Sequence, residues 1–172
     1  MKKKLIILFL MFTMSFVFSQ GSNGLHPSVK IDIPNNFSKL STEAINKKYT
    51  IPTNRPTVAY ASPDNTASIS YHHTQNLLPK ERVKELRDLL VQQFGAAKMQ
   101  ILSNEIKVLN KNEVVFIEMI APSYTEGNIY NIITATNLDD RMLLISFSCS
   151  EILMPKWRDK AFKILESLKI SQ

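Results

Sequence analysis

The sequence has few of the residues that usually mark a catalytic or cofactor site. Cys149 is the only cysteine, so no disulfide can form within the chain and its stability must come from packing. Four glycines in 172 residues leave no glycine-rich loop to cradle a phosphate, and the serine nucleophile motif GxSxG is absent. The carboxylates are scattered, with no pair marked for acid and base roles. We therefore expect no catalytic residue and no cofactor.

Long apolar runs are also absent, except near the N-terminus. Lysines occupy positions 2–4, residues 5–12 are all apolar, and Val17, Phe18 and Ser19 precede Gln20. This three-part pattern predicts a signal peptide at residues 1–19, with cleavage before Gln20. The apolar run is shorter than the roughly 20 residues of a spanning helix, although a retained anchor is the alternative. Residues 16–24 contain no cysteine for a lipid, so we expect a protein exported to the periplasm or the extracellular space, with no membrane span after cleavage.

Basic residues are not concentrated anywhere in the predicted mature chain. The formal net charge of +6 includes the three N-terminal lysines, and residues 1–19 contain no acid, so 6 − 3 leaves +3 after cleavage. Nucleic-acid binding needs a basic face, which this even distribution does not predict. We expect no nucleic-acid partner.

The remaining chain reads as a flexible lead-in at 20–27 and a single domain at 28–172. Alternation and turn residues predict strands at 28–33, 57–62, 66–74 and 98–109, and richly apolar strands at 113–121, 128–136 and 141–149. Caps and apolar stripes predict a short helix at 41–48 and longer helices at 79–95 and 155–169. Hairpin connections dominate, and the last three strands are apolar on both faces. The predicted fold is α+β: an α/β/α sandwich with a mainly antiparallel sheet of about seven strands and two main flanking helices.

Several short segments carry a family resemblance. They are Ile33-Pro-Asn-Asn-Phe37, Lys48-Tyr49 before a proline-rich loop, residues 58–69, and Ile145-Ser-Phe-Ser-Cys149 followed by Trp157 and Ser167-Leu-Lys169. In these the chain resembles secreted PsbP-like (DcrB-like) proteins, whose fold is shared with PsbP and the Ran-binding Mog protein. The resemblance covers residues 29–170 and implies the fold and an accessory or binding role. No residue that binds those proteins' partners is matched here.

Four residues are candidates for ligand binding: Arg55 in the loop 52–56, the strand pair His72 and His73, and Tyr124 in the loop 122–127. Adjacent strand residues point to opposite faces, so His72 and His73 are not expected to share a metal ion, and we predict no metal site. Ser68, Ser70 and His72 form one polar face. We expect Cys149 and Trp157 to be buried in the core.

These observations favour an exported, non-catalytic binding or accessory protein. Its partner, another protein or a small molecule, and its oligomeric state are left open by the sequence. Two alternatives stay open as well. An unrecognised hydrolase would need a deep cleft with converging titratable residues. An adaptor or chaperone for another exported protein would need a broad apolar groove.

Overall fold

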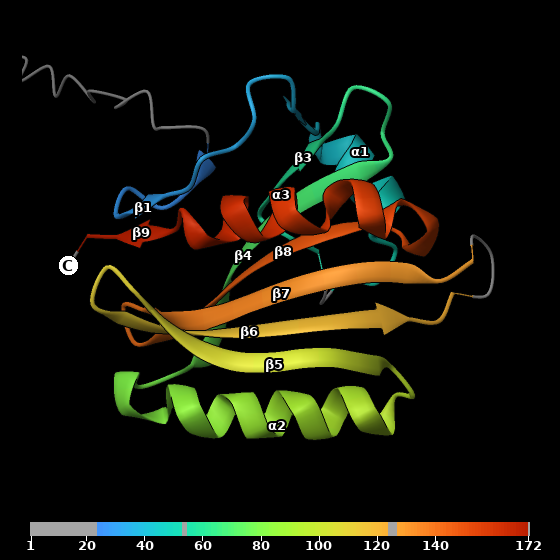
Figure 1. The fold of residues 1–172 in the computed structure, drawn as a ribbon. Coiled ribbons are helices and arrows are strands. Elements are labelled where there is room, and N and C mark those ends of the chain that lie inside the picture. The colour runs from blue at the N-terminus through green and yellow to red at the C-terminus, as the bar shows by residue number, and fades with distance from the viewer. Residues whose placement is uncertain (1–23, 53–54, 124–126, 172) are drawn as a thin grey trace, which may run out of the picture.

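A seven-stranded antiparallel sheet runs through the computed structural model of the protein (Figure 1). Its strands are β2 (Ser38–Lys39), β3 (Val58–Ala61), β4 (Ala67–Leu77), β5 (Gln100–Leu109), β6 (Asn112–Ala121), β7 (Ile129–Leu138) and β8 (Arg141–Ser150). They lie in the order β2-β3-β4-β8-β7-β6-β5, and each neighbouring pair is antiparallel. The predicted fold class is confirmed.

The structure describes residues 24–52, 55–123 and 127–171. The predicted signal peptide at 1–19 and the candidate residue Tyr124 lie outside these ranges.

Two tight turns join the strands of the last meander. Asn110 and Lys111 connect β5 to β6, and Asp139 and Asp140 connect β7 to β8. All four have positive φ angles, between 46° and 68°. Two consecutive residues of this kind match the twist of the flanking strands, and Asn and Asp tolerate the conformation better than most residues. Both turns fall in the gaps between predicted strands, the first between 98–109 and 113–121 and the second between 128–136 and 141–149.

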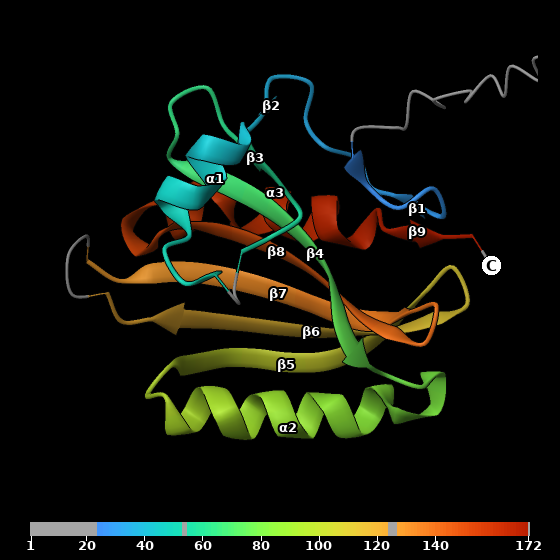
Figure 2. The ribbon, with the colours of Figure 1, turned by 180° about the vertical axis from the view of Figure 1, so that it is seen from behind.

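Two helices cover opposite faces of the sheet (Figures 1 and 2). Helix α2 (Val83–Ala96) follows a 3₁₀ turn at Lys80–Arg82 and packs on β5, β6 and β7. Helix α3 (Met154–Glu166) follows a second 3₁₀ turn at Glu151–Leu153 and packs on β8 and β7. The short helix α1 (Thr42–Lys48) begins at Ser41, whose hydroxyl accepts a hydrogen bond from the backbone N–H of Ala44. Of the two residues that could cap this helix by sequence, Ser41 and Thr42, the structure uses Ser41.

The strands of the meander send apolar side chains to both helices. In β6, Val114 and Phe116 belong to the α3 side, whereas Val115 and Ile117 belong to the α2 side. This alternation is the reason why the strands are apolar at nearly every position. Cys149 and Trp157 are buried on the α3 side, as predicted.

The segment predicted as a strand at 28–33 is placed differently. Only β1 (Val29–Lys30) is a strand, and it pairs with β9 (Lys169–Ile170) instead of joining the main sheet. Farther along, the backbone N–H of Asp32 donates to the Ser167 hydroxyl. The predicted helix at 155–169 ends earlier, at Glu166, because the chain turns there to form β9. The seventh strand of the sheet is β2.

None of the helices within the described ranges is long and apolar enough to cross a membrane.

Candidate functional site

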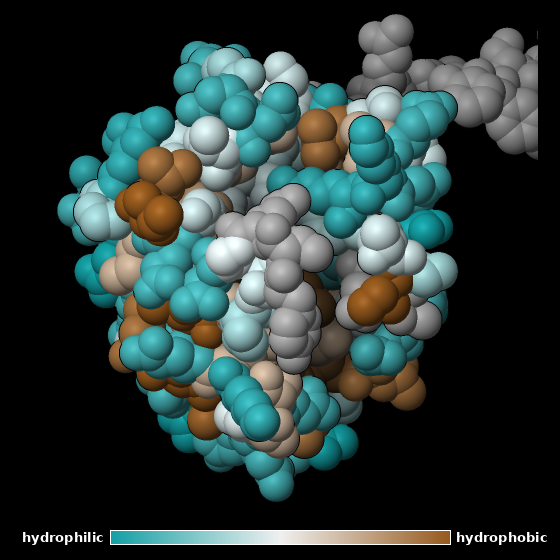
Figure 3. Space-filling view, turned by 90° about the vertical axis from the view of Figure 1, so that its right-hand side faces the viewer, coloured by the Kyte–Doolittle hydropathy of each residue, from teal (hydrophilic) through white to brown (hydrophobic). Residues whose placement is uncertain are grey.

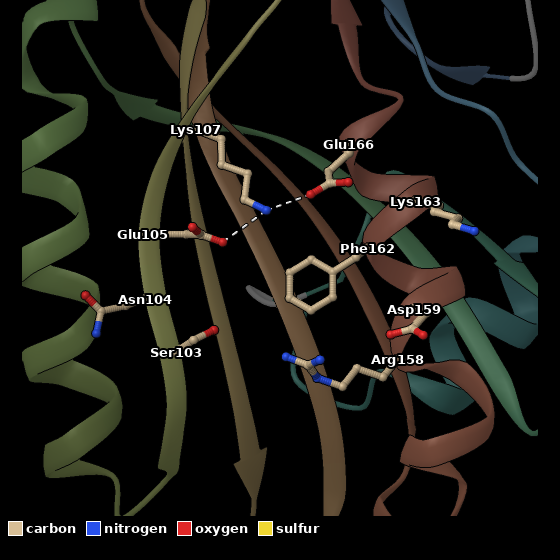
Figure 4. Close-up of a pocket in the computed structure, with 9 residues that line it drawn as sticks. All are labelled: Ser103, Asn104, Glu105, Lys107, Arg158, Asp159, Phe162, Lys163 and Glu166. Atoms are coloured by element: carbon tan, nitrogen blue, oxygen red, sulfur yellow. Dashed lines mark hydrogen bonds and ion pairs between the residues drawn. The ribbon is translucent and has the colours of Figure 1, made fainter.

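A groove of about 570 Å³ opens between β5 and α3 (Figure 4). Helix α3 packs on β8 and β7, so on this face β6 and β5 are covered by side chains and not by a helix. On β5, Ser103, Glu105 and Lys107 occupy alternate positions and point toward α3 (Figure 4). We call this site the β5–α3 groove; its lining consists of Ser103, Asn104, Glu105, Lys107, Arg158, Asp159, Phe162, Lys163 and Glu166.

A buried carboxylate holds α3 to the sheet beside the groove. The Glu118 side chain on β6 is 2% exposed. One of its oxygens accepts hydrogen bonds from Arg158 Nε at 2.6 Å and from the Tyr130 hydroxyl at 2.7 Å. The other accepts from Arg158 Nη2 at 3.0 Å and from the Ser103 hydroxyl at 3.1 Å. The network therefore ties β5, β6, β7 and α3 together.

These hydrogen bonds decide the charge state of the network. Burial raises the pKa of Glu118, but the bonds from Arg158, Tyr130 and Ser103 lower it more, so it lies below its ordinary value. Burial and the adjacent carboxylate raise the pKa of Tyr130. At neutral pH the network is thus an ionised carboxylate, a guanidinium and a neutral phenol. A carboxylate paired in this way is a poor general acid or base.

Lys107 bridges the groove from β5 to α3. Its ammonium nitrogen lies 2.6 Å from Glu166 Oε1 on α3 and 3.0 Å from Glu105 Oε1 on β5 (Figure 4). It also lies 5.0 Å from the ring centroid of Phe116 and 5.1 Å from that of Phe162. Burial lowers the pKa of Lys107, but these two carboxylates raise it more. Both aromatic rings and the ion pairs keep this lysine charged and oriented.

The charges of the groove are balanced. Its cations are Lys107, Arg158 and Lys163, and its acids are Glu105, Asp159 and Glu166. Histidine and cysteine are not among the lining residues, so the groove offers no nucleophile beside a histidine base. Within the described ranges, no three His, Cys, Asp or Glu side chains gather closely enough to hold a metal ion. Such a lining can form ion pairs with a partner that itself carries both signs of charge.

The two candidate histidines on β4 lie on opposite faces of the strand, away from the groove. The His73 ring nitrogen Nε2 lies 2.9 Å from the carbonyl oxygen of Leu138. Its ring packs edge-on against His26 with centroids 5.7 Å apart, and His26 Nε2 lies 3.3 Å from Asp139 Oδ2. His26 could not be placed from the sequence, because 46 positions separate it from His72. The two imidazoles tie the start of the described chain to the end of β7.

His72 belongs to the polar face that the sequence predicted. Burial and the neighbouring His73 lower the pKa of His72. The Ser70 hydroxyl lies 2.7 Å from that of Ser146 on β8. Burial raises the pKa of Tyr49, and the nearby hydroxyls of Ser68 and Ser70 partly offset this rise.

Arg55 is held beside this face rather than beside the groove. Its Nε donates to the Tyr49 carbonyl oxygen at 2.9 Å. Tyr49 thereby links the loop of Arg55 to the polar strand face of His72. A ligand role for Arg55, His72, His73 and Tyr124 stays a prediction.

Sequence reasoning missed the groove and its network. Glu118 is the only charged residue between Val114 and Ala121 in an otherwise apolar strand. A charge at such a position is buried only if it is paired, so it signals a cationic partner. That signal does not identify Arg158, which lies 40 positions away on a helix.

Cys149 gives a first testable result. Burial raises the pKa of its thiol to about 11, and the residue is 4% exposed. Because the thiolate is the reactive species, a thiol reagent is expected to label the native protein far more slowly than the urea-unfolded chain. Equal labelling rates at pH 8 would contradict the buried position.

Known proteins resemble this chain in structure and not in sequence. No protein-family model matches it, and no curated protein matches it. The solution structure of cyanobacterial PsbP (CyanoP) from Synechocystis sp. PCC 6803 superposes with a TM-score of 0.58 at 9% identity, covering 84% of this chain and 87% of that one. The Ran-binding protein Mog1p of Saccharomyces cerevisiae superposes with a TM-score of 0.51 at 9% identity, covering 84% and 90%. The chain has the Mog1p/PsbP-like fold. The resemblance drawn from the residues is therefore confirmed for the fold, and similarity at 9% identity shows nothing more than the fold.

This protein presents a mixed surface at the end where β6 leads to β7 (Figure 3). Hydrophilic residues prevail there, and the hydrophobic ones form separate patches instead of one continuous area.

Proposed function

We propose that this protein is an exported, non-catalytic binding or accessory protein that holds a partner protein in the β5–α3 groove. The observation that carries the proposal is the groove itself: an open site with three cations and three acids on a sheet and a helix that Glu118 and Arg158 bind together. Polar groups mounted on rigid elements recognise a partner at a lower ordering cost than groups on mobile loops. The signal-peptide pattern at residues 1–19 supports export.

The shape of the groove favours a protein partner over a small molecule. Small-molecule sites are mostly apolar and enclose their ligand, whereas charged, open surfaces are typical of the polar rim of a protein interface. Phe162 supplies the aromatic surface between the charges. Mog1p, which has the same fold, is a Ran-binding protein. This precedent supports a binding role in general and does not identify the partner.

The hydrolase alternative fits the groove less well. Titratable residues do converge there, but Lys107 is paired with Glu105 and Glu166, and Arg158 is paired with Glu118. Hydrolysis needs a group that gains or loses a proton near neutral pH. The hydrogen bonds of Glu118 keep its pKa below that range.

A second candidate function, an adaptor for another exported protein, rests on an apolar cleft at the end of β4. This cleft has a volume of about 290 Å³ and includes Leu77, Leu86 and Leu89, with Leu77 79% exposed. It is half the size of the β5–α3 groove, and it would suit one or two apolar side chains of a partner.

An exchange of charges on α3 tests the proposed site. The double variant Asp159→Lys/Lys163→Glu keeps the net charge and changes two exposed groove residues. If a partner of complementary charge binds there, its capture from native envelope extract is expected to fall at least about tenfold, a loss of roughly 1.4 kcal/mol. The measurement is quantitative pull-down followed by mass spectrometry.

The matched control is Arg87→Glu/Asp88→Lys, which exchanges an adjacent ion pair on α2. It should capture the same partner as the unmodified protein. If both double variants captured as much partner as the unmodified protein, the β5–α3 groove would be excluded as the binding site. Loss with the control alone would move the site to α2.

A further inference from the structure

We propose that two copies of this protein associate through β5, antiparallel about Ile106, so that their two β5–α3 grooves join on one face of a continuous sheet. This inference goes beyond the proposed function and does not depend on it. It rests on the free edge of β5 and on the order of charges along that strand.

Strand β5 is the last strand of the sheet and has β6 as its only strand neighbour within the described ranges. Its outer edge therefore carries backbone N–H and C=O groups that no strand pairs there. Such an edge is a template for another strand unless something blunts it. Proline does not occur in β5, and its one irregularity lies between Ile101 and Ser103. The stretch 103–109 pairs with β6 without a register shift, so its outer backbone groups alternate regularly along the edge.

The side chains of this edge are partly apolar and unusually exposed. Val108 is 69% exposed and Leu102 is 37% exposed. An exposed edge strand with apolar side chains tends to pair with another chain. This observation indicates a partner but leaves its identity open.

The charges identify the partner as a second copy. In antiparallel pairing centred on Ile106, Glu105 lies directly opposite Lys107 of the partner subunit, and Lys107 lies opposite Glu105 of the partner subunit. Directly opposite residues share one face of a sheet, so both ion pairs form on the groove side.

The neighbouring registers lack this match. Pairing centred on Glu105 places that acid opposite itself, and pairing centred on Lys107 places two lysines together. Like charges directly opposite each other destabilise a sheet. The sequence of β5 is therefore self-complementary in one register.

The resulting pair has an extended site. A twofold axis perpendicular to the sheet leaves both grooves on the same side, with β6-β5-β5-β6 as the floor and one α3 as each wall. Lys107, which already contacts Glu105 and Glu166 of its own chain, would also face Glu105 of the partner subunit. On the other face, where α2 packs on β5 and β6, the two α2 helices would flank the same axis.

Charge reversal on β5 tests this arrangement by sedimentation equilibrium of the purified mature chain at low salt. The unmodified chain is expected to be a dimer. Glu105→Lys places two lysines opposite each other at both positions, and Lys107→Glu does the same with two glutamates. Each variant alone is expected to dissociate at least tenfold more readily.

An equimolar mixture of the two variants should recover the dimer, because lysine then faces glutamate at both positions. Recovery on mixing cannot be explained by misfolding of either variant. The groove variant Asp159→Lys/Lys163→Glu serves as a control and should stay dimeric. A monomeric unmodified chain at every concentration would overturn the proposal and leave the β5 edge to a strand of another protein. A dimer that both β5 variants retain, or a mixture that stays monomeric, would also overturn it.

Discussion

Replacing Arg158 by methionine is expected to lower the free energy of unfolding by about 3 kcal/mol, because the variant leaves the buried Glu118 carboxylate without its cationic partner. Glu118 is 2% exposed and would keep only its bonds to Tyr130 and Ser103. Methionine keeps an apolar side chain of similar length, but it loses the guanidinium, whose Cζ lies 5.2 Å from the Phe162 ring centroid. Urea unfolding at pH 7 measures the change.

The cause of that loss can be isolated with a second substitution. Glutamine at position 118 keeps two polar atoms for Tyr130 and Ser103 but carries no charge. Arg158→Met/Glu118→Gln should therefore regain more than half of the lost stability. If the double variant instead lost as much stability as the two single variants added together, a buried, unpaired charge would not be the cause.

The pH dependence gives an independent check of the same network. In the folded protein the pKa of Glu118 is below its ordinary value of 4.5. The ionised carboxylate therefore stabilises the folded protein above pH 4.5, and this stabilisation is lost as the pH falls from 4.5 through the lowered pKa. In Arg158→Met the unpaired carboxylate is a cost only while it is ionised. The difference in unfolding free energy between the two proteins should shrink as the pH falls toward 4.5 and below.

The fold could be predicted from the sequence because its signals are local. Alternation in β4, the apolar stripe of α2, the cap at Ser41 and the turn at Asp139 and Asp140 each depend on a few adjacent residues. Strand order is less local. The pairing of β4 with β8 joins residues more than 60 positions apart, and β9 forms only because β1 lies beside it.

The candidate site was harder to predict because it depends on distances between elements. Position 118 in β6 reveals a charge in an apolar strand, but its partners come from β5, β7 and α3. His72 and His73 were predicted as ligand-binding candidates because histidine is a common ligand-binding residue. In the structure His73 and His26 form local ties, and the groove contains neither. The charged residues of α3 show no distinctive sequence pattern, and they line a groove only because α3 packs beside β5.

Replacing Phe147 by alanine tests whether the stability of the core can be lowered without affecting binding in the groove. Phe147 is fully buried on β8 and lies 5.7 Å from the Trp157 ring centroid on α3. Removing a buried phenylalanine ring is expected to lower the free energy of unfolding by about 4 kcal/mol, because the cavity adds to the lost transfer free energy. Thermal and urea unfolding measure this loss.

The same variant should keep the partner captured by the groove, when assayed well below its melting temperature. Asp159→Lys/Lys163→Glu should show the reverse pattern, with stability nearly unchanged and capture lost, since both residues are exposed. If Phe147→Ala abolished capture while still fully folded, the sheet core would take part in binding directly. In this interpretation the apolar strands β6, β7 and β8 provide the stable core. The charged side chains of α3 and β5 that line the groove recognise the partner.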